Sequence, residues 1–342
     1  MTSPGCTKKK AVVGIILGLL VVCMFIGRVT YSRHLHKLLC HVQSINIDKS
    51  PEEIAAGGQA GEIQERMADD MDLADLTALL ETHTKGQKRR LPQAIVIGIR
   101  KCGTRALLEM LKMHPQIAAA SEEVHFFDNN YERGIEWYRR RMPFSYGDQI
   151  TIEKSPAYFI TPEAPARVFK MSKDVKLLII VRDPTTRAIS DYTQIWTSKN
   201  QKGKDYKTFE EFSMKNGEVN ESYKPLQISI YNQHIKKWLE YFPRRQMHLV
   251  DGGKLISNPY PEIKEVERFL GLSDYIVSEN FFLNKTRGFY CLKSEKVNKC
   301  LAESKGREHP EVSPYVLQKL QEFFRPYNQA FFDTIGRKFD WS

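Results

Sequence analysis

Cysteine is scarce in this chain, with six residues among 342, and this scarcity excludes a fold built mainly from disulfides. Disorder of the chain as a whole is excluded too, because 42% of its residues are hydrophobic and 27% are charged. Histidine and cysteine form no cluster with the spacing of metal ligands, so we expect no metal site. A length of 342 residues is too great for one small module and fits about two structural units.

Acidic residues are missing from residues 1–40, which hold six of the 51 lysines and arginines. Residues 41–90 reverse the balance, with six basic and ten acidic residues. By subtraction, residues 91–342 carry 39 basic and 31 acidic residues, a net charge of +8 against +10 for the whole chain. A basic surplus of this kind favours an acidic partner, such as nucleic acid, anionic lipid or an anionic polysaccharide.

Charges are also absent from residues 11–27, which read AVVGIILGLLVVCMFIG. A helix of that length is about 26 Å long, which is the lower limit for a bilayer span. Three lysines precede the run, Arg28 follows it, and no small-residue cleavage site ends it. We therefore predict an uncleaved transmembrane anchor, with a cleaved signal peptide and a buried core helix as the alternatives.

The lysine cluster on the short N-terminal side predicts a cytoplasmic tail of residues 1–10 and a lumenal main part. A short span suits a thin early-secretory or Golgi bilayer, so we expect a single-pass type II protein of the Golgi membrane. Residues 28–90 are predicted to be a lumenal stem, because residues 41–90 are acidic overall, contain the small-residue run AAGGQAG and show no strand pattern. We interpret the stem as a spacer before a catalytic domain of residues 91–342.

Short apolar runs alternate with segments of helical period from Leu91 onward. This alternation predicts an α/β domain with a central, mostly parallel sheet flanked by helices, which binds ligands at the carboxyl ends of its strands. The predicted strands are Ala94–Ile99, Thr151–Lys154, Lys176–Val181 and Gln246–Val250. The predicted helices are Ala106–Met113, Pro162–Lys170, a segment from Pro184 through Ser190, Ile228–Tyr241 and Pro261–Leu270.

The segment RKCGTRALLEML, after the first predicted strand, has the glycine spacing of a phosphate-binding loop. Four residues separate Gly98 from Gly103, and such a loop presents backbone N–H groups at the positive end of a helix dipole. Thr104 stands where a nucleotide triphosphatase has lysine, and the lysine lies inside the loop as Lys101. The loop therefore suits a phosphate or sulfate group, with an ordinary tight turn as the alternative.

A second anion signal is the segment VRDPTTRAISDYTQ, which follows the third predicted strand. Arg182 stands where the buried strand ends, and Ser190 lies two helical turns further on. Together they could hold a second phosphate, whereas a simple capped helix start is the alternative.

A third signal is the segment EEVHFFD, which contains Glu123, His125 and Asp128. A carboxylate beside a histidine can accept a proton from a hydroxyl group. The polar residues alternate with Val124 and Phe126, and this alternation predicts a half-buried strand with its polar groups on one face. An acidic turn without a chemical role is the alternative.

These three segments, together with TIEKSPAYF, GFYCL and SKGREHP, resemble the heparan sulfate glucosamine 3-O-sulfotransferases. The resemblance covers Leu91 to Trp341, in order and without a large gap, and is greatest for the isoform 5 type. It implies transfer of a sulfuryl group from 3′-phosphoadenylyl sulfate (PAPS) to the 3-hydroxyl of glucosamine in heparan sulfate. It also implies a sulfotransferase fold like that of P-loop kinases, and heparan sulfate rather than nucleic acid as the partner.

The resemblance further implies which residues bind the donor PAPS. The loop would surround the 5′-phosphosulfate, Arg182 and Ser190 would hold the 3′-phosphate, and a late segment would close over the donor. The implied PAPS-binding residues are Lys101, Cys102, Gly103, Thr104, Arg105, Arg182, Ser190, Tyr290, Lys305, Gly306, Arg307, Glu308 and His309.

For catalysis, the resemblance implies that Glu123 is the general base, supported by His125 and Asp128, with Lys101 and Lys154 as catalytic cations. The implied reaction is an in-line attack of the sugar hydroxyl on the sulfuryl group. It needs no metal, because lysines and backbone donors can stabilise the transferring oxygens. The implied acceptor-binding residues are Glu123, Val124, His125, Phe126, Asp128, Lys154, Ser155, Gln194, Tyr223, Lys224 and Arg307.

Cys102 departs from the family pattern, which usually has two glycines after the loop lysine. If this position needs a positive φ, the cysteine is strained there by about 1–3 kcal/mol, and if φ is negative it is tolerated. The departure puts donor affinity in doubt more than identity. The thiol beside Lys101 is also predicted to be reactive, because nearby cations lower a thiol pKa.

Cys291 and Cys300 enclose a short segment that a disulfide could close in an oxidising compartment, with a reduced pair as the alternative. The chain-entropy model gives such a loop roughly 2–3 kcal/mol. Asn220 and Asn284 begin glycosylation sequons. Both features fit a lumenal catalytic domain.

Three other functions stay open at this stage. Another PAPS-dependent glycosaminoglycan sulfotransferase would modify a different acceptor position. A catalytically impaired, heparan-sulfate-binding membrane protein would fail to bind PAPS, and Cys102 is the reason to consider it. A lumenal kinase would show competition by ATP at the donor site.

Overall fold

The computed structural model describes residues 86–286, 288–294, 298–300 and 307–341. The predicted tail (residues 1–10), anchor (11–27) and most of the stem (28–90), with Lys305 and Gly306, lie outside the described residues. In the part of the chain that is described, no helix is both long enough and apolar enough to cross a bilayer.

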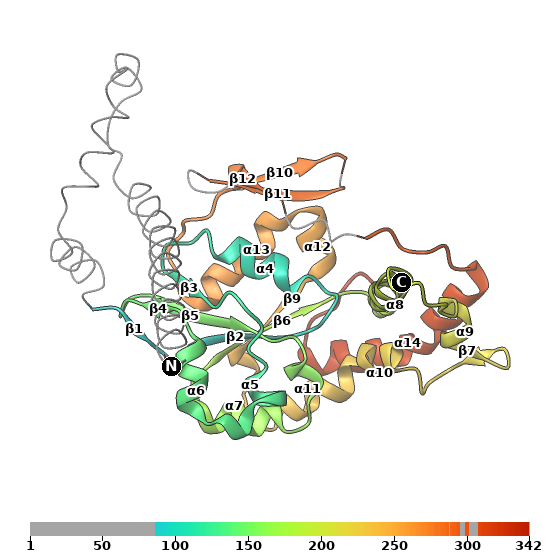
Figure 1. Cartoon of the computed structure of the whole chain (residues 1–342), viewed down its shortest axis with the longest axis horizontal. Coiled ribbons are helices and arrows are strands. Elements are labelled where there is room, and N and C mark those ends of the chain that lie inside the picture. Colours follow the sequence, from blue (N-terminus) through green and yellow to red (C-terminus); the bar gives the residue numbers. More distant parts are fainter. Residues whose placement is uncertain (1–85, 287, 295–297, 301–306, 342) are drawn as a thin grey trace, which may run out of the picture. The chain divides into compact units, whose positions relative to one another are not determined.

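A five-stranded parallel sheet forms the centre of the described domain (Figure 1). In register, Val96 of the middle strand faces Lys154 on one neighbour and Leu178 on the other. The strands lie in the order β3 (Ile117–Ala119), β5 (Ile150–Lys154), β2 (Ala94–Gly98), β6 (Lys176–Val181) and β9 (Met247–Asp251).

Helices cover both faces of this sheet, as the continuous apolar strands β2 and β6 require. One face carries α4 (Thr104–Leu111), α12 (Gly252–Ser257) and α13 (Pro259–Leu270) (Figure 1). The other face carries α5 (Phe126–Asn129), α7 (Ala164–Met171) and α11 (Tyr231–Leu239). The predicted α/β architecture is thereby confirmed.

A second hydrophobic core lies beside the sheet, where α8 (Pro184–Asn200) packs on α10 (Lys224–Ser229) and α14 (Pro314–Ile335). Its fully buried side chains include Ala188, Leu226 and Leu320. The smaller elements around it are α9 (Phe209–Ser213), β7 (Met214–Lys215) and β8 (Glu218–Val219).

A three-stranded antiparallel sheet is formed by β10 (Phe281–Asn284), β11 (Phe289–Lys293) and β12 (Asn298–Lys299). A disulfide joins Cys291 to Cys300, which confirms the predicted pairing. The remaining elements are β1 (Lys88–Arg89), β4 (Phe144–Ser145), α6 (Ile135–Arg141), and the short 3-10 helices Tyr131–Arg133, Tyr158–Ile160, Arg244–Gln246 and Ser278–Asn280.

The four predicted strands are present, and only their ends shift by one residue. The predicted helix Ile228–Tyr241 is wrong at its start, because Ile230 separates α10 from α11. The helix after Pro184 runs on to Asn200. The short strand β3 and the long helix α14 were not predicted.

Candidate active site

The predicted site residues gather at the carboxyl ends of three adjacent strands. The loop of residues 99–103 follows β2, Lys154 ends β5, and Arg182 follows β6. This edge is where open α/β sheets bind their ligands.

The backbone of the loop between β2 and α4 is folded tightly. Lys101 has φ 72° and Gly103 has φ 112°, both in the left-handed region. A Cβ atom added to Gly252 would lie 2.3 Å from the carbonyl oxygen of Cys102, so the start of α12 presses directly on the loop. No side chain caps the start of α4, which leaves its first N–H groups for an anion.

Side chains of α8 hold this loop in place. Lys101 Nζ donates a hydrogen bond to Gln194 Oε1 at 2.9 Å, and Arg100 Nη2 lies 2.6 Å from Asp191 Oδ1. The other oxygen of Asp191 lies 3.0 Å from Nη1 of the fully buried Arg187. Arg187 and Asp191 were not predicted, although an arginine and an aspartate four residues apart on one helix are a recognisable pair.

Cys102 is not among the loop residues with positive φ, so the strain considered for it does not arise. Its side chain is completely buried, and its sulfur lies 3.9 Å from the hydroxyl of Tyr231. Burial raises the pKa of the Cys102 thiol to about 11, although nearby arginine charges oppose the shift. The prediction of a reactive thiol is therefore wrong, because burial outweighs the cations.

His309, in the described part of the late segment, lies within electrostatic range of the same edge of the sheet. The pKa of His309 is lowered by burial and then by the charges of Arg182 and Lys101, so these three residues lie close together. Tyr231 donates a hydrogen bond from its hydroxyl to the carbonyl of Arg182 at 2.8 Å, which fixes the start of α8. Ser190 is partly exposed on α8.

Arg105 links the start of α4 to the segment that precedes Glu123, because its Nη1 donates to the carbonyl of Ser121 at 3.0 Å. Tyr290 is partly buried on β11, where it packs against the main core. Arg307 is partly exposed and Glu308 is exposed. The roles implied for these residues stay predictions.

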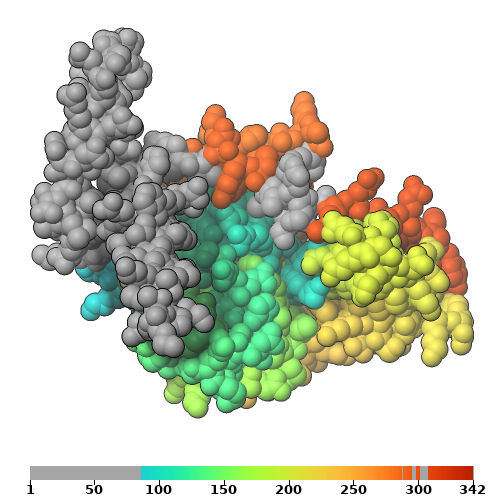
Figure 2. Space-filling model, viewed as in Figure 1, coloured from blue at the N-terminus to red at the C-terminus, as the bar shows by residue number. Residues whose placement is uncertain are grey.

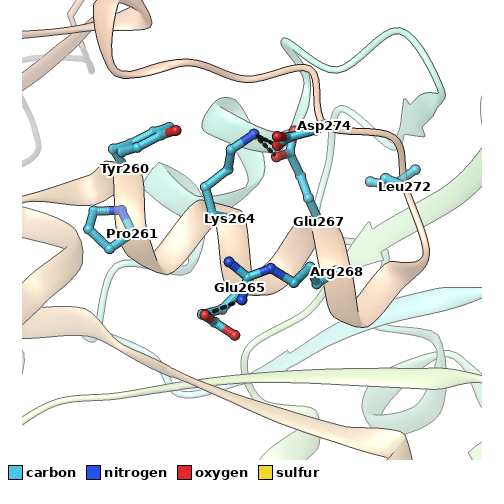
Figure 3. Close-up of a pocket in the computed structure, with 8 residues that line it drawn as sticks. All are labelled: Tyr260, Pro261, Lys264, Glu265, Glu267, Arg268, Leu272 and Asp274. Atoms are coloured by element: carbon cyan, nitrogen blue, oxygen red, sulfur yellow. Dashed lines mark hydrogen bonds and ion pairs between the residues drawn. The ribbon is translucent and has the colours of Figure 1, made fainter.

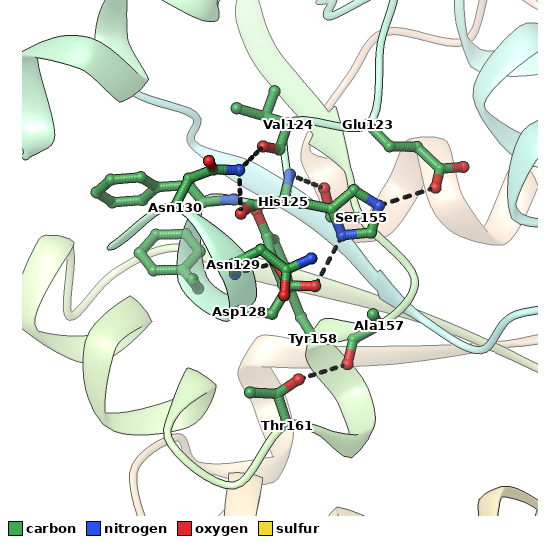
Figure 4. Close-up of polar contacts among 12 residues, drawn as sticks. Glu123, Val124, His125, Asp128, Asn129, Asn130, Ser155, Ala157, Tyr158 and Thr161 are labelled. Atoms are coloured by element: carbon green, nitrogen blue, oxygen red, sulfur yellow. Dashed lines mark hydrogen bonds and ion pairs between the residues drawn. The ribbon is translucent and has the colours of Figure 1, made fainter. Parts of the chain in front are cut away.

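Four of the five predicted catalytic residues, all except Lys101, form one hydrogen-bonded chain, and Figure 4 shows its part from Glu123 through His125 to Asp128. Lys154 Nζ donates to Glu123 Oε1, and His125 Nε2 lies 3.3 Å from Glu123 Oε2. The other ring nitrogen of His125 lies 2.7 Å from Asp128 Oδ2. The Glu123 side chain is 42% exposed and that of Lys154 is 2% exposed, so the carboxylate faces outward from a buried lysine.

This arrangement keeps Glu123 ionised. Partial burial opposes ionisation, but the hydrogen bond and charge of Lys154, followed by His125, outweigh it and hold the pKa of Glu123 below its ordinary value. The two ring nitrogens of His125 lie between Glu123 and Asp128 and hold the ring in one orientation. The carboxylate is then fixed in the form that accepts a proton.

The segment around Glu123 is a turn and not the predicted strand. His125 has φ 50°, in the left-handed region, and α5 begins at the next residue. The N–H of His125 donates to Ser155 Oγ at 3.0 Å, and the N–H of Phe126 donates to the hydroxyl of Tyr158 at 2.7 Å. We call residues 123–128 the catalytic turn; it, and not an extended face, brings Glu123 beside His125.

Three predicted acceptor contacts lie beneath this turn and not on its surface. Phe126 is 1% exposed and stacks on Tyr138 with ring centroids 4.5 Å apart. Ser155 is completely buried, and Val124 is buried as well. The acceptor-binding role implied for these three residues stays a prediction.

Tyr223 is partly buried against the second hydrophobic core, and the acceptor contact implied for it stays a prediction. Its ring stacks on Phe212 at 5.5 Å, and its hydroxyl is buried without a hydrogen-bond partner among the described residues. Burial raises the pKa of this hydroxyl. Lys224 and Gln194 are exposed, as an acceptor contact requires.

A basic groove lies along the second half of α8. One residue that lines it is Gln194, which accepts a hydrogen bond from Lys101. The groove has a volume of about 260 Å³, and it is lined by Gln194, Ile195, Ser198, Lys199, Lys202 and Lys204. In the space-filling view the yellow-green atoms of α8 reach the surface on the face shown (Figure 2). The three lysines were not predicted, because nothing in the sequence marks them as neighbours of the loop.

A larger hollow of about 570 Å³ lies on α13 (Figure 3). Charged side chains in this hollow form ion pairs with one another: Lys264 pairs with Glu267 at 2.7 Å and with Asp274. The hollow lies on the face of the sheet opposite α5 (Figure 1), and no predicted site residue lines it. We therefore place the active site at the catalytic turn.

Comparison with known proteins agrees with this geometry. Residues 91–335 match the sulfotransferase domain family. The structure is similar to the crystal structure of a sulfotransferase from Alicyclobacillus acidocaldarius, with a TM-score of 0.56 and 22% identity over 73% of this chain and 98% of that one. The fold and the domain define a sulfotransferase.

The sequence is also similar to curated proteins of known activity. It is 56% identical over 266 residues to heparan sulfate glucosamine 3-O-sulfotransferase 5 of Mus musculus, which is 76% of this chain and 77% of that protein. It is 48% identical over 259 residues to heparan sulfate glucosamine 3-O-sulfotransferase 3B1 of Homo sapiens, which is 74% of this chain and 65% of that protein. The chain belongs to the heparan sulfate glucosamine 3-O-sulfotransferase family, which confirms the resemblance inferred from its motifs.

Proposed function

We propose that this protein transfers a sulfuryl group from PAPS to the 3-hydroxyl of glucosamine residues in heparan sulfate. Family membership supports the reaction. The observation that carries the proposal is the half-exposed Glu123 carboxylate, held by the buried Lys154 at the sheet edge that also presents the loop of residues 99–103. A base for the acceptor and a cradle for the donor thus occupy adjacent strand ends.

The residues around the loop fit an anionic donor. The uncapped start of α4 offers backbone N–H groups, and Lys101, Arg182 and Arg105 bring positive charge. PAPS supplies the sulfuryl group when it is bound. Lys101 stabilises the charge that develops on the phosphate oxygen as its bond to sulfur breaks. We infer that the reaction needs no metal.

On the acceptor side, Glu123 takes the proton of the sugar hydroxyl while the new oxygen–sulfur bond forms. Lys154 and His125 hold the two carboxylate oxygens, and the exposed part of the carboxylate is left for the sugar. Asp128 orients the His125 ring from its other side. General-base assistance of this kind contributes typically 10²–10⁴ in rate.

The basic groove on α8 extends the acceptor site. Lys199, Lys202 and Lys204 can pair with sulfate and carboxylate groups of a chain whose reacting sugar lies at Glu123. Gln194 joins the groove to Lys101, so one polysaccharide can contact both. The net charge of +8 in residues 91–342 favours the same partner.

Disaccharide analysis tests the proposed function directly. Heparan sulfate is incubated with the protein and ³⁵S-labelled PAPS, and the labelled position is identified after enzymatic digestion. We expect label on the 3-oxygen of glucosamine. Label confined to nitrogen or to another oxygen would assign a different glycosaminoglycan sulfotransferase, and no label would point to a heparan-binding protein without activity.

We also infer that the chain is a type II Golgi membrane protein. The support is the uncharged run of residues 11–27 behind the lysine cluster, and the Cys291–Cys300 disulfide, which suits an oxidising lumen. On this proposal residues 28–90 are the stem and residues 91–342 the lumenal domain. Protease protection in sealed Golgi vesicles tests the orientation, since digestion of the catalytic domain without detergent would contradict it.

Glycosylation at Asn220 and Asn284 belongs to the same proposal. The side-chain N–H of Asn220 donates to the carbonyl of Phe212 at 2.8 Å, and that of Asn284 lies 3.6 Å from the sulfur of Cys300. A mass shift on treatment with peptide N-glycosidase would support a lumenal domain. The variants Asn220→Gln and Asn284→Gln assign the shift to each site.

A further inference from the structure

A buried carboxyl group, Glu153, lies beneath the catalytic turn and takes no part in the reaction as described so far. It precedes Lys154 on β5 and is completely buried. Its partners are hydroxyl groups. Tyr138 donates to Oε1 at 3.1 Å, Ser155 donates to Oε2 at 3.0 Å, and a side-chain hydrogen bond joins Glu153 to Tyr158.

Two of these hydroxyl groups also hold the catalytic turn from below. Ser155 Oγ accepts the N–H of His125 at 3.0 Å, and the hydroxyl of Tyr158 accepts the N–H of Phe126 at 2.7 Å. A hydroxyl oxygen that accepts from an amide is free to direct its own proton to Glu153. Each of the two hydroxyl groups then accepts a hydrogen bond from an amide of the turn and donates one to Glu153, so Glu153 is the partner that they share.

The turn needs such support because of its backbone. His125 adopts φ 50°, which a non-glycine residue takes up only at a cost in free energy and which persists where the surroundings hold it. The two amides held by hydroxyls are those on either side of this conformation. Glu123 lies two residues away, so a loosened backbone moves the carboxylate relative to the sugar hydroxyl.

Burying the carboxyl group of Glu153 in the core lowers the stability of the fold. Burial raises the pKa of Glu153 to about 7, against the hydrogen bonds of Tyr158, Ser155 and Tyr138 and the charge of His125, all of which lower it. A buried carboxyl group without a buried cation costs stability, and an apolar side chain of similar size would avoid that cost. The hydrogen bonds that connect Glu153 through Ser155 and Tyr158 to the turn give this carboxyl group a role that core packing alone does not explain.

We propose that Glu153 is a positioning residue of the sulfotransferase reaction, which orients the hydroxyls of Ser155 and Tyr158 and thereby fixes the backbone that presents Glu123. This inference deepens the proposed function and rests on it. Glu153 touches neither donor nor acceptor, so its effect is on turnover and not on donor binding.

The variant Glu153→Gln tests the proposal on the full chain, with Glu267→Gln as the matched control. Glu267 is likewise buried and hydrogen-bonded, but it lies in the hollow on α13, on the other face of the sheet (Figures 1 and 3). We expect Glu153→Gln to lower kcat by about 10- to 100-fold, because small displacements of catalytic groups cost that much. The affinity for adenosine 3′,5′-bisphosphate (PAP), measured by calorimetry, should change by less than about 2-fold, and Glu267→Gln should leave both quantities at the wild-type level.

Amide hydrogen exchange gives a second readout that needs no activity. Mass spectrometry of peptides covering residues 121–130 reports the amides of His125 and Phe126. In Glu153→Gln their exchange should be at least about 10-fold faster, while peptides from the rest of the domain exchange as in the wild type. Faster exchange throughout the domain would show a general structural role and overturn the proposal, as would unchanged exchange with unchanged kcat.

If Glu153→Gln does not fold, two tyrosine variants test the proposal in its place. Tyr138→Phe and Tyr158→Phe each remove one hydroxyl from Glu153, but only Tyr158 also accepts from the catalytic turn. We expect the larger loss of kcat and of amide protection in Tyr158→Phe. Equal losses in the two variants would contradict the connection through Tyr158.

A double-mutant cycle separates this proposal from the function on which it rests. In a Glu123→Gln background the base is already gone, so adding Glu153→Gln should lower kcat by less than about 2-fold, and a full additional loss would overturn the positioning role. If the wild type sulfates no heparan sulfate, the proposed function fails, and the exchange comparison still decides the role of Glu153. If transfer occurs and Glu153→Gln leaves kcat and exchange unchanged, the positioning role alone fails.

Discussion

The loop of residues 99–103 and the catalytic turn lie at the ends of neighbouring strands but are held in different ways. Each contains one non-glycine residue in the left-handed region, Lys101 in the loop and His125 in the turn. The loop is held from the side by charged and polar groups of α8, through Asp191 and Gln194. The turn is held from below by the hydroxyls of buried residues.

This difference matches the two tasks of a sulfotransferase. The donor carries several negative charges, and the uncapped start of α4 together with the cations around the loop binds them in the ground state. The acceptor hydroxyl is neutral, so the catalytic turn contributes little binding and must instead place one carboxylate accurately. Variants on the two sides should therefore separate donor affinity from turnover.

The largest expected effect follows removal of the base. Glu123→Gln keeps the shape of the side chain but cannot take up a proton, so kcat should fall by about 10²–10⁴. Glu122→Gln is the matched control, because its side chain is exposed and one residue away. Sulfate incorporation measures both variants, and substantial turnover by Glu123→Gln would move the base elsewhere, with His125 as the next candidate.

Removal of the loop lysine should affect both quantities at once. Lys101→Ala takes away a charge that acts on the bound donor and on the developing phosphate charge, so we expect kcat to fall about 100-fold and donor affinity to weaken as well. Kinetics and PAP calorimetry on the same preparation measure the two effects. An unchanged donor affinity would mean that Lys101 acts only during transfer.

The basic groove should affect acceptor binding alone. We expect the triple variant Lys199→Ser, Lys202→Ser, Lys204→Ser to raise the KM for heparan sulfate about 10-fold at low salt, with kcat nearly unchanged and the difference shrinking as salt screens the charges. Lys236→Ser with Lys237→Ser on α11 is the control, since both lysines are exposed and neither lines the groove. An equal rise in KM for the control would show that the total positive charge, and not the groove, determines the affinity for heparan sulfate.

Cys102 should matter for stability more than for chemistry. Cys102→Gly removes a completely buried side chain, so we expect about 1 kcal/mol of lost stability and a change in PAP affinity below about 2-fold. Because its pKa is raised to about 11, the thiol stays protonated at neutral pH and should resist iodoacetamide until the protein unfolds. Rapid labelling of the native protein would contradict the buried position.

Removal of metal should have the smallest effect. Lysines and backbone N–H groups carry the charge stabilisation proposed here, so excess EDTA should leave turnover within experimental error of the untreated enzyme. A loss of activity that Mg²⁺ or another divalent ion restores would show that the account of the loop is incomplete.

The features that could be predicted from the sequence are those that neighbouring residues define. The glycine spacing of Gly98 and Gly103, the apolar run Lys176–Val181, and the grouping of Glu123 with His125 are all local patterns. Their physical meaning, a tight loop, a buried strand and an acid–base pair, follows from a few consecutive residues. The structure brings these patterns together at one edge of the sheet because parallel strands end there.

The features that could not be predicted depend on tertiary contacts. Alternation in the segment around Val124 indicated a strand, but hydrogen bonds from its backbone amides to Ser155 and Tyr158, about 30 residues away, select a turn. Glu153 lies in a strand that was predicted, yet two of its hydroxyl partners come from other elements, Tyr138 from α6 and Tyr158 from the 3-10 helix Tyr158–Ile160. The long helix α14 was missed because Pro326 interrupts its pattern, and a proline inside a helix normally ends it.

The separation of donor binding from proton removal is tested most directly by PAP binding to the Glu123→Gln variant. Calorimetric titration with PAP, beside the wild type, measures the donor site without any turnover. We predict dissociation constants that agree within about 2-fold, in a variant that has lost 10²–10⁴ of its turnover. Loss of PAP binding in Glu123→Gln would contradict this account, because it would make Glu123 a structural part of the donor site and not the base for the acceptor.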